Sequence, residues 1–130
     1  MLRAALEKFS ESPDLNHALG LAVVRLGRAD EALEYFARSA DLFPAEPRYA
    51  YVYGIALYDT GQKERAFEVL EQAHDRVPAN PQVLSALVTY YNQEGNLKEA
   101  LKYGRKLLEL APTDPNLRQM VESLEAGLSG

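Results

Sequence analysis

The feature that most constrains the fold of this chain is the recurrence of proline, glycine and alanine at a fixed interval of 34 residues. Four columns share this period: Pro13, Pro47, Pro81 and Pro115; Gly27, Gly61 and Gly95; Ala32, Ala66 and Ala100; and Pro44, Pro78 and Pro112. No insertion interrupts the register. A fixed period of this length is typical of repeat architectures, in which each unit is one supersecondary motif that stacks on its neighbours.

Each unit has the residues expected of two helices joined by a tight turn. The first proline follows Ser12, Asn80 or Asp114, which are good N-cap residues, so we expect it to open a helix. In the middle unit it follows Glu46, which is a poor N-cap. The glycine ends this first helix in a left-handed conformation, and the second proline ends the second helix.

Apolar side chains recur at helical spacing within each unit, so one helical hairpin cannot bury its apolar faces alone. The sequence therefore predicts a stack of units within one domain. The expected segments are 1–12 as part of a helix from a preceding unit, 13–46, 47–80 and 81–114 as complete units, and 115–130 as a capping helix. A start in mid-unit favours an excised fragment over a degenerate first unit.

The pattern resembles the tetratricopeptide repeat family over essentially the whole chain. The family's close-packed small position is Ala32, Ala66 and Ala100, and its other small position is Gly20 and Gly54. The third unit departs from the pattern at three positions, which are Val88, Gly104 and Leu107. The resemblance implies an all-α fold, a right-handed superhelix of antiparallel helix pairs whose first helices line a concave surface.

Composition argues against several functional classes. The chain of 130 residues has no cysteine, which excludes thiol nucleophiles and thiolate metal sites. Its net charge of −5 would repel a phosphate backbone, so we do not expect nucleic acid as a partner. No segment is apolar enough to span a membrane, and enzymatic motifs are absent. The two histidines lie in different units, and we expect His74 to be solvated near a helix end. We therefore predict no catalytic activity, no metal and no cofactor.

The resemblance also indicates where a partner would bind. Family members contact ligands mainly through five columns of the first helices, and we select ten residues from these columns. The predicted binding residues are His17, Leu21, Arg25, Arg48, Tyr51, Ile55, Tyr58, Gln82, Thr89 and Asn92. Tyr51 and Tyr58 either bind a partner or pack against neighbouring first helices, whereas Tyr53 and Leu57 are expected to be buried.

Members of the family that bind the acidic C-termini of chaperones use a clamp of lysines, arginines and asparagines. The clamp positions here hold His17, Leu21, Val52, Gln82 and Ala86, so this clamp is missing. An extended peptide of apolar or aromatic character is the expected ligand.

We therefore predict a protein–protein interaction scaffold that binds a peptide or helix of a partner and is part of a larger, bacterial protein. One alternative is a structural or dimerising spacer. Another is an accessory domain of a larger enzyme such as a multihaem cytochrome, although no haem-binding CxxCH occurs here. The expected state is a soluble monomer, or a weak homodimer through its N-terminal end, in the cytoplasm or periplasm.

Overall fold

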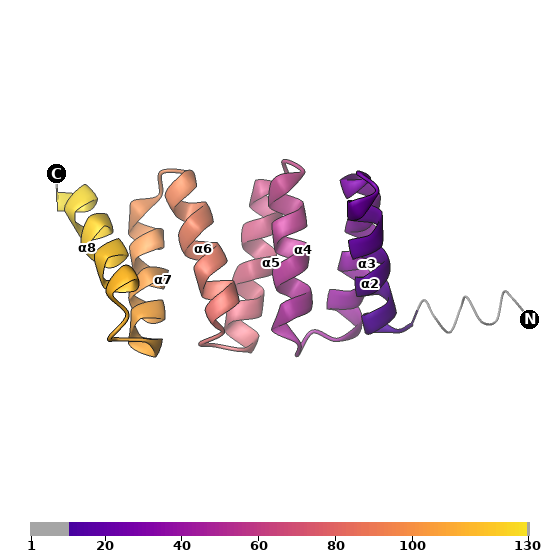
Figure 1. Ribbon diagram of the computed structural model, residues 1–130, viewed down its shortest axis with the longest axis horizontal. Helices are drawn as coiled ribbons and strands as arrows, with labels where there is room; N and C mark the ends of the chain where they lie inside the picture. The colour runs from indigo at the N-terminus through magenta and orange to yellow at the C-terminus, as the bar shows by residue number, and fades with distance from the viewer. Residues whose placement is uncertain (1–10, 130) are drawn as a thin grey trace, which may run out of the picture. The chain divides into compact units, whose positions relative to one another are not determined.

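The computed structural model describes residues 11–129, which form seven α-helices and no strand (Figure 1). The helices are α2 (Pro13–Arg25), α3 (Ala29–Leu42), α4 (Pro47–Asp59), α5 (Lys63–Arg76), α6 (Pro81–Gln93), α7 (Leu97–Leu110) and α8 (Pro115–Ser129). Residues 1–10, most of the expected partial helix 1–12, lie outside the described residues. Within the described part, no helix is long and apolar enough to cross a membrane.

The chain divides into two compact units, one ending at Ala73 and the other beginning at His74, near the end of α5. In the first unit α2 packs against α3 and α3 against α4. In the second unit α6, α7 and α8 follow one another side by side, with α7 in contact with both neighbours (Figure 1). The division into three repeats and a cap within one domain stays a prediction.

Local chemistry explains where the first helices begin. The side chains of Ser12, Asn80 and Asp114 each accept a hydrogen bond from a backbone N–H in the first turn of the following helix, at 3.2, 3.0 and 2.9 Å. Glu46 is a correction to the sequence analysis, because its carboxylate also caps a helix and accepts from the backbone N–H of Arg48 at 3.2 Å. A carboxylate is further favoured there by the positive end of the helix dipole.

The recurrent glycines occupy the turns between paired helices. Gly27, Gly61 and Gly95 have φ values of 79°, 90° and 79°, a left-handed conformation that strains residues with a side chain. Each turn thus reverses the chain directly after a first helix and allows the second helix to return alongside it.

The recurrent alanines of the repeat lie in the core. Ala32, Ala66 and Ala100 are completely buried. In the first unit Leu57, Ala66 and Val69 make a buried cluster, and Leu33, Ala50, Tyr53 and Tyr58 pack against it. Tyr53 was expected to be buried but is half-buried, because it lies at the margin of this cluster, whereas Leu57 is buried as expected.

Candidate binding surface

The ten predicted binding residues lie on three first helices, α2, α4 and α6, and fall in both compact units. The helix α8 begins at the proline column that opens each first helix, so we count it as a first helix as well. We call the non-buried side chains in the predicted columns of α2, α4, α6 and α8 the first-helix surface. We describe its parts separately for each unit. None of the ten residues is fully buried, so each retains some accessible area.

On α4 the predicted residues differ in their exposure and in their contacts with other side chains. Arg48 is exposed, and Tyr51 and Ile55 are half-buried. Tyr58 is also half-buried, but its ring makes an edge-to-face contact with Phe67 of α5, with the ring centroids 6.3 Å apart. The ammonium of Lys63 lies 5.4 Å from the same ring. Tyr58 therefore packs within the α4–α5 hairpin and not against a neighbouring first helix, and it is the weakest binding candidate on α4.

On α2 the predicted residue His17 belongs to an aromatic contact between helices. Its ring centroid lies 6.0 Å from that of Phe36 on α3 and 5.2 Å from that of Tyr49 on α4. The Tyr49 hydroxyl donates a hydrogen bond to the Asp14 carboxylate, which joins α2 to α4 and raises the pKa of the phenol. The structure thus uses His17 for packing, while Leu21 is half-buried and Arg25 is exposed.

Burial lowers the pKa of His17, and the positive charge of Arg48 lowers it further, against an opposing effect of Asp14. The Nδ1 atom of this ring is buried and has no hydrogen-bond partner in the structure. A charged imidazolium is therefore disfavoured in this contact, and His17 is suited to packing in its neutral form.

On α6 the predicted residues Gln82, Thr89 and Asn92 are exposed, and the last two line a cavity of about 320 Å³. The cavity lies between α6 and α8 of the second unit. Its lining residues are Val88, Thr89, Asn92, Gln93, Leu97, Met120, Ser123 and Leu124, none of which carries a charge. Apolar side chains with a few amide and hydroxyl groups are typical of sites that bind uncharged ligand groups.

The contribution of α8 to this cavity was missed by the sequence analysis, which treated 115–130 only as a cap. Ser123 occupies the same repeat column as Leu21, Ile55 and Thr89, so extending the binding columns into the fourth helix would have found it. Met120 also lines the cavity from α8, and it belongs to the column of Val52 and Ala86, from which none of the ten predicted binding residues was chosen.

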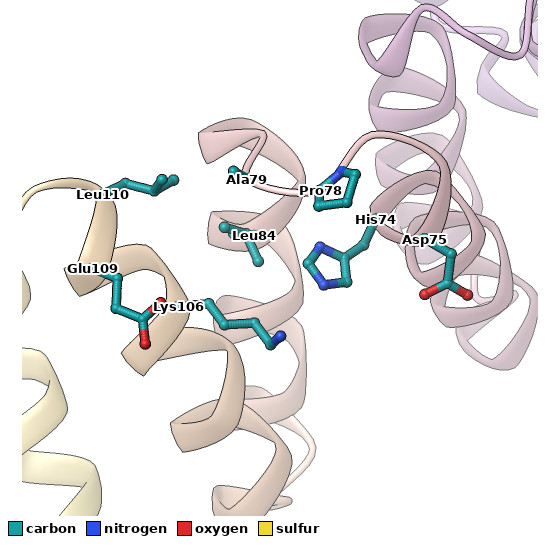
Figure 2. A pocket seen from close by; sticks show the side chains of 8 residues that line it. All are labelled: His74, Asp75, Pro78, Ala79, Leu84, Lys106, Glu109 and Leu110. Carbon is teal, nitrogen blue, oxygen red and sulfur yellow. The ribbon is translucent and has the colours of Figure 1, made fainter.

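A second pocket, of about 350 Å³, lies near the end of α5 and between α6 and α7 (Figure 2). Figure 2 shows the His74 ring and the Lys106 side chain pointing toward each other across it. His74 was expected to be solvated, but it is half-buried and packs edge-to-face on Tyr103, with the centroids 5.5 Å apart. Burial, followed by the charge of Lys106, lowers its pKa. None of the predicted binding residues lines this pocket.

Comparison with known proteins identifies the architecture. Two sequence profiles described as tetratricopeptide repeat match the chain, one at residues 1–47 and 17–81 and the other at 57–124. The chain belongs to the tetratricopeptide repeat family. The all-α solenoid of helix pairs expected from the sequence is therefore confirmed. No curated protein gives a significant match to the whole sequence.

Solved tetratricopeptide structures share the fold. The first repeat domain of Spaghetti, bound to the HSP90 peptide SRMEEVD, has a TM-score of 0.77 at 18% identity and covers 93% of this chain and 98% of its own. MamA has a TM-score of 0.80 at 17% identity, covering 98% of this chain and 74% of its own. YrrB, described as having an unusual peptide-binding site, has a TM-score of 0.73 at 21% identity, covering 86% and 57%. At these identities the similarity concerns the fold.

Catalytic equipment is not evident in the described tetratricopeptide repeats. Residues 11–129 contain no group of three histidine, cysteine or acidic side chains that could hold a metal ion. Burial is the main cause of the lowered pKa of His17 and of His74, and both rings pack against other aromatic side chains. The absence of enzymatic activity stays a prediction from the sequence.

Proposed function

We propose that this tetratricopeptide repeat chain is a protein–protein interaction scaffold that binds an extended peptide segment of a partner on its first-helix surface. The observation that carries the proposal is the uncharged cavity between α6 and α8, which contains Thr89 and Asn92, two residues chosen from the sequence alone. Peptide complexes on the same fold, such as that of Spaghetti, give independent support.

The lining of the cavity favours a particular kind of anchor. Val88, Met120 and Leu124 provide an apolar base for an uncharged side chain of the partner. Asn92 and Ser123 provide amide and hydroxyl groups that can pair with the peptide backbone. No lysine or arginine lines the cavity, so an acidic C-terminal tail would lose hydration there without gaining a cationic partner.

A second part of the proposed surface lies on α4 of the first unit. Arg48, Tyr51 and Ile55 retain exposed area and combine a planar cation, an aromatic ring and a branched apolar group. Arginine and tyrosine are enriched among residues that dominate binding energy at protein interfaces. We infer that this part also contacts a peptide segment, with Tyr51 as its main anchor.

A displayed peptide library, selected on the full chain, tests the proposal. Selected peptides should share an uncharged apolar residue, and Ser123→Phe, which fills the cavity, should weaken their binding by about tenfold or more. Glu122→Phe is the matched control, because Glu122 is exposed on the same helix and does not line the cavity. Equal affinities of both variants would place the binding site elsewhere, and the absence of any selected peptide would favour the structural spacer.

A further inference from the structure

The pocket at the end of α5 and between α6 and α7 combines two half-buried basic side chains, His74 and Lys106, with an apolar lining. All of its lining residues lie in the second compact unit. Its volume of about 350 Å³ falls within the range of small-molecule sites, roughly 300–1,000 Å³. Leu84, which is 1% exposed, contributes a buried apolar surface, and Pro78 and Leu110 add further apolar area.

His74 offers a hydrogen-bond donor on the pocket side of its ring. Its Nδ1 atom is buried and has no hydrogen-bond partner in the structure, whereas Figure 2 shows the other ring nitrogen, Nε2, on the side of Lys106. Burial and the charge of Lys106 lower the pKa of His74, so the ring is neutral at pH 7 and carries one proton. Because a buried N–H without an acceptor is unfavourable, this proton belongs on Nε2, where it can be donated to a ligand.

The ammonium group of Lys106 is the second donor. This side chain extends from α7 toward His74 across the pocket (Figure 2). In the part of the chain that the structure describes, Lys106 forms no ion pair. An ammonium and an imidazole N–H directed into the same space favour a negatively charged acceptor, because charge-assisted hydrogen bonds are stronger than neutral ones. A carboxylate meets this requirement.

Two acidic side chains, Asp75 and Glu109, also line the pocket, but both are exposed. Water and salt therefore screen their charges more than those of the half-buried basic groups. The charges that act on His74 are those of Lys106 and Lys102 on one side and of Asp75 on the other, so positive charge is in excess at this ring. The exposed carboxylates should still repel ligands that carry more than one negative charge, and the pocket favours a monoanion.

The link that precedes α6 has a backbone feature that supports a binding site here. Ala79 lines the pocket with a φ of 69°, and it is the only residue other than glycine with a positive φ among residues 11–129. Ala45 and Thr113, its equivalents in the links before α4 and α8, do not share this conformation. A left-handed conformation is unfavourable for alanine, and backbone strain of this kind is concentrated at functional sites.

We propose that this pocket binds a small monocarboxylate with an apolar body. The carboxylate accepts hydrogen bonds from His74 Nε2 and from the Lys106 ammonium, and the apolar body packs against Leu84 and Pro78. The ligand is a small organic acid and not a partner protein. The site is separate from the first-helix surface, so it does not depend on the proposed binding of a peptide there.

Titration of the full, isotope-labelled chain with phenylacetate tests the proposal, with the neutral phenylacetamide as the matched ligand. Phenylacetate should shift the amide signals of Asp75, Ala79 and Lys106 in a saturable way, with a Kd of about 1 mM or below. Phenylacetamide should bind roughly tenfold more weakly, because it keeps the ring but lacks the charge. The pKa of His74, followed through its ring protons, should rise on binding of phenylacetate, since a neighbouring carboxylate favours the imidazolium.

Two lysine variants separate the proposed contact from a general effect of charge. Lys106→Met removes the ammonium but keeps the length of the side chain, and it should weaken phenylacetate binding by about tenfold. Lys98→Met is the matched control, because Lys98 is exposed on the same helix and does not line the pocket. Glu109→Gln should strengthen binding of the dianion phenylmalonate more than that of phenylacetate, since it removes a like charge at the pocket.

Several results would overturn the proposal. Equal affinities for phenylacetate and phenylacetamide would make the pocket a purely apolar site, and equal losses in the two lysine variants would exclude a specific role for Lys106. An unchanged pKa of His74, or shifts confined to the cavity between α6 and α8, would also contradict it. None of these results bears on peptide binding at the first-helix surface, which is measured separately with the selected peptides.

Discussion

Gly54 and Gly104 both lie inside helices, but their surroundings differ. A Cβ at Gly54 of α4 would lie 2.7 and 2.8 Å from the Cγ and Cδ2 atoms of Leu70, closer than carbon atoms can approach without movement. A Cβ at Gly104 of α7 would meet Met120 at 3.5 Å, an ordinary van der Waals contact. The first glycine is required by close packing of the α4–α5 hairpin, whereas the second leaves space for a methyl group.

Alanine substitutions at these two positions should therefore change stability in opposite directions. Gly54→Ala should lower the free energy of unfolding by about 1–3 kcal/mol through overpacking against Leu70. Gly104→Ala should raise it by about 0.5–1 kcal/mol, because alanine restricts the unfolded chain and favours the helix. Urea unfolding of the two variants and the wild type measures both effects. Destabilisation by Gly104→Ala of the same size as by Gly54→Ala would contradict the packing described for α7.

The beginnings of the first helices are held by side-chain hydrogen bonds to the N-cap residue, one each at Ser12, Glu46 and Asn80 and two at Asp114. At α6 the Asn80 side chain accepts from the backbone N–H of Val83 at 3.0 Å. Asn80→Ala should therefore cost about 1 kcal/mol of stability, and Asn80→Asp, which keeps the acceptor, should cost much less. Thermal unfolding monitored by circular dichroism compares the two variants. If Asn80→Asp lost as much stability as Asn80→Ala, the cap would not be the cause.

Helix boundaries were predictable from the sequence because they depend on local chemistry. Proline and an N-cap residue open α2, α6 and α8, and glycine with a positive φ follows α2, α4 and α6. The roles of His17 and Tyr58 were harder to predict from the sequence. They depend on rings brought in by other helices, Phe36 and Tyr49 for His17 and Phe67 for Tyr58. A repeat column indicates the face of a helix, but side-chain contacts across helices decide whether a residue on that face packs or remains available.

Each compact unit contains one histidine that is held in a partly buried aromatic contact, which should make the whole molecule sensitive to mild acid. Burial is the main cause of the lowered pKa of His17 and of His74. At His17 the charge of Arg48 lowers the pKa further, and the charge of Asp14 raises it. At His74 the charges of Lys106 and Lys102 lower the pKa further, and the charge of Asp75 raises it. The unfolded chain therefore binds protons more readily than the folded chain as the pH falls through 6.5.

Stability should consequently be greatest above that pH and decrease as the pH falls from about 7.5 to about 5.5. The double variant His17→Gln, His74→Gln should show a flatter dependence across this window, because glutamine does not take up a proton. Melting temperatures of wild type and variant at matched ionic strength provide the comparison. Parallel curves for the two proteins would mean that neither histidine contributes to the acid sensitivity.

The most direct test of the binding surface is a map of amide chemical-shift changes in the full, isotope-labelled chain during titration with a library-selected peptide. We predict that the changes concentrate on the first helices, at Tyr51 and Ile55 of α4, Thr89 and Asn92 of α6, and Ser123 of α8. Changes concentrated instead at Asp75, Lys106 and Glu109, around the pocket shown in Figure 2, would contradict the account and assign partner binding to the second helices.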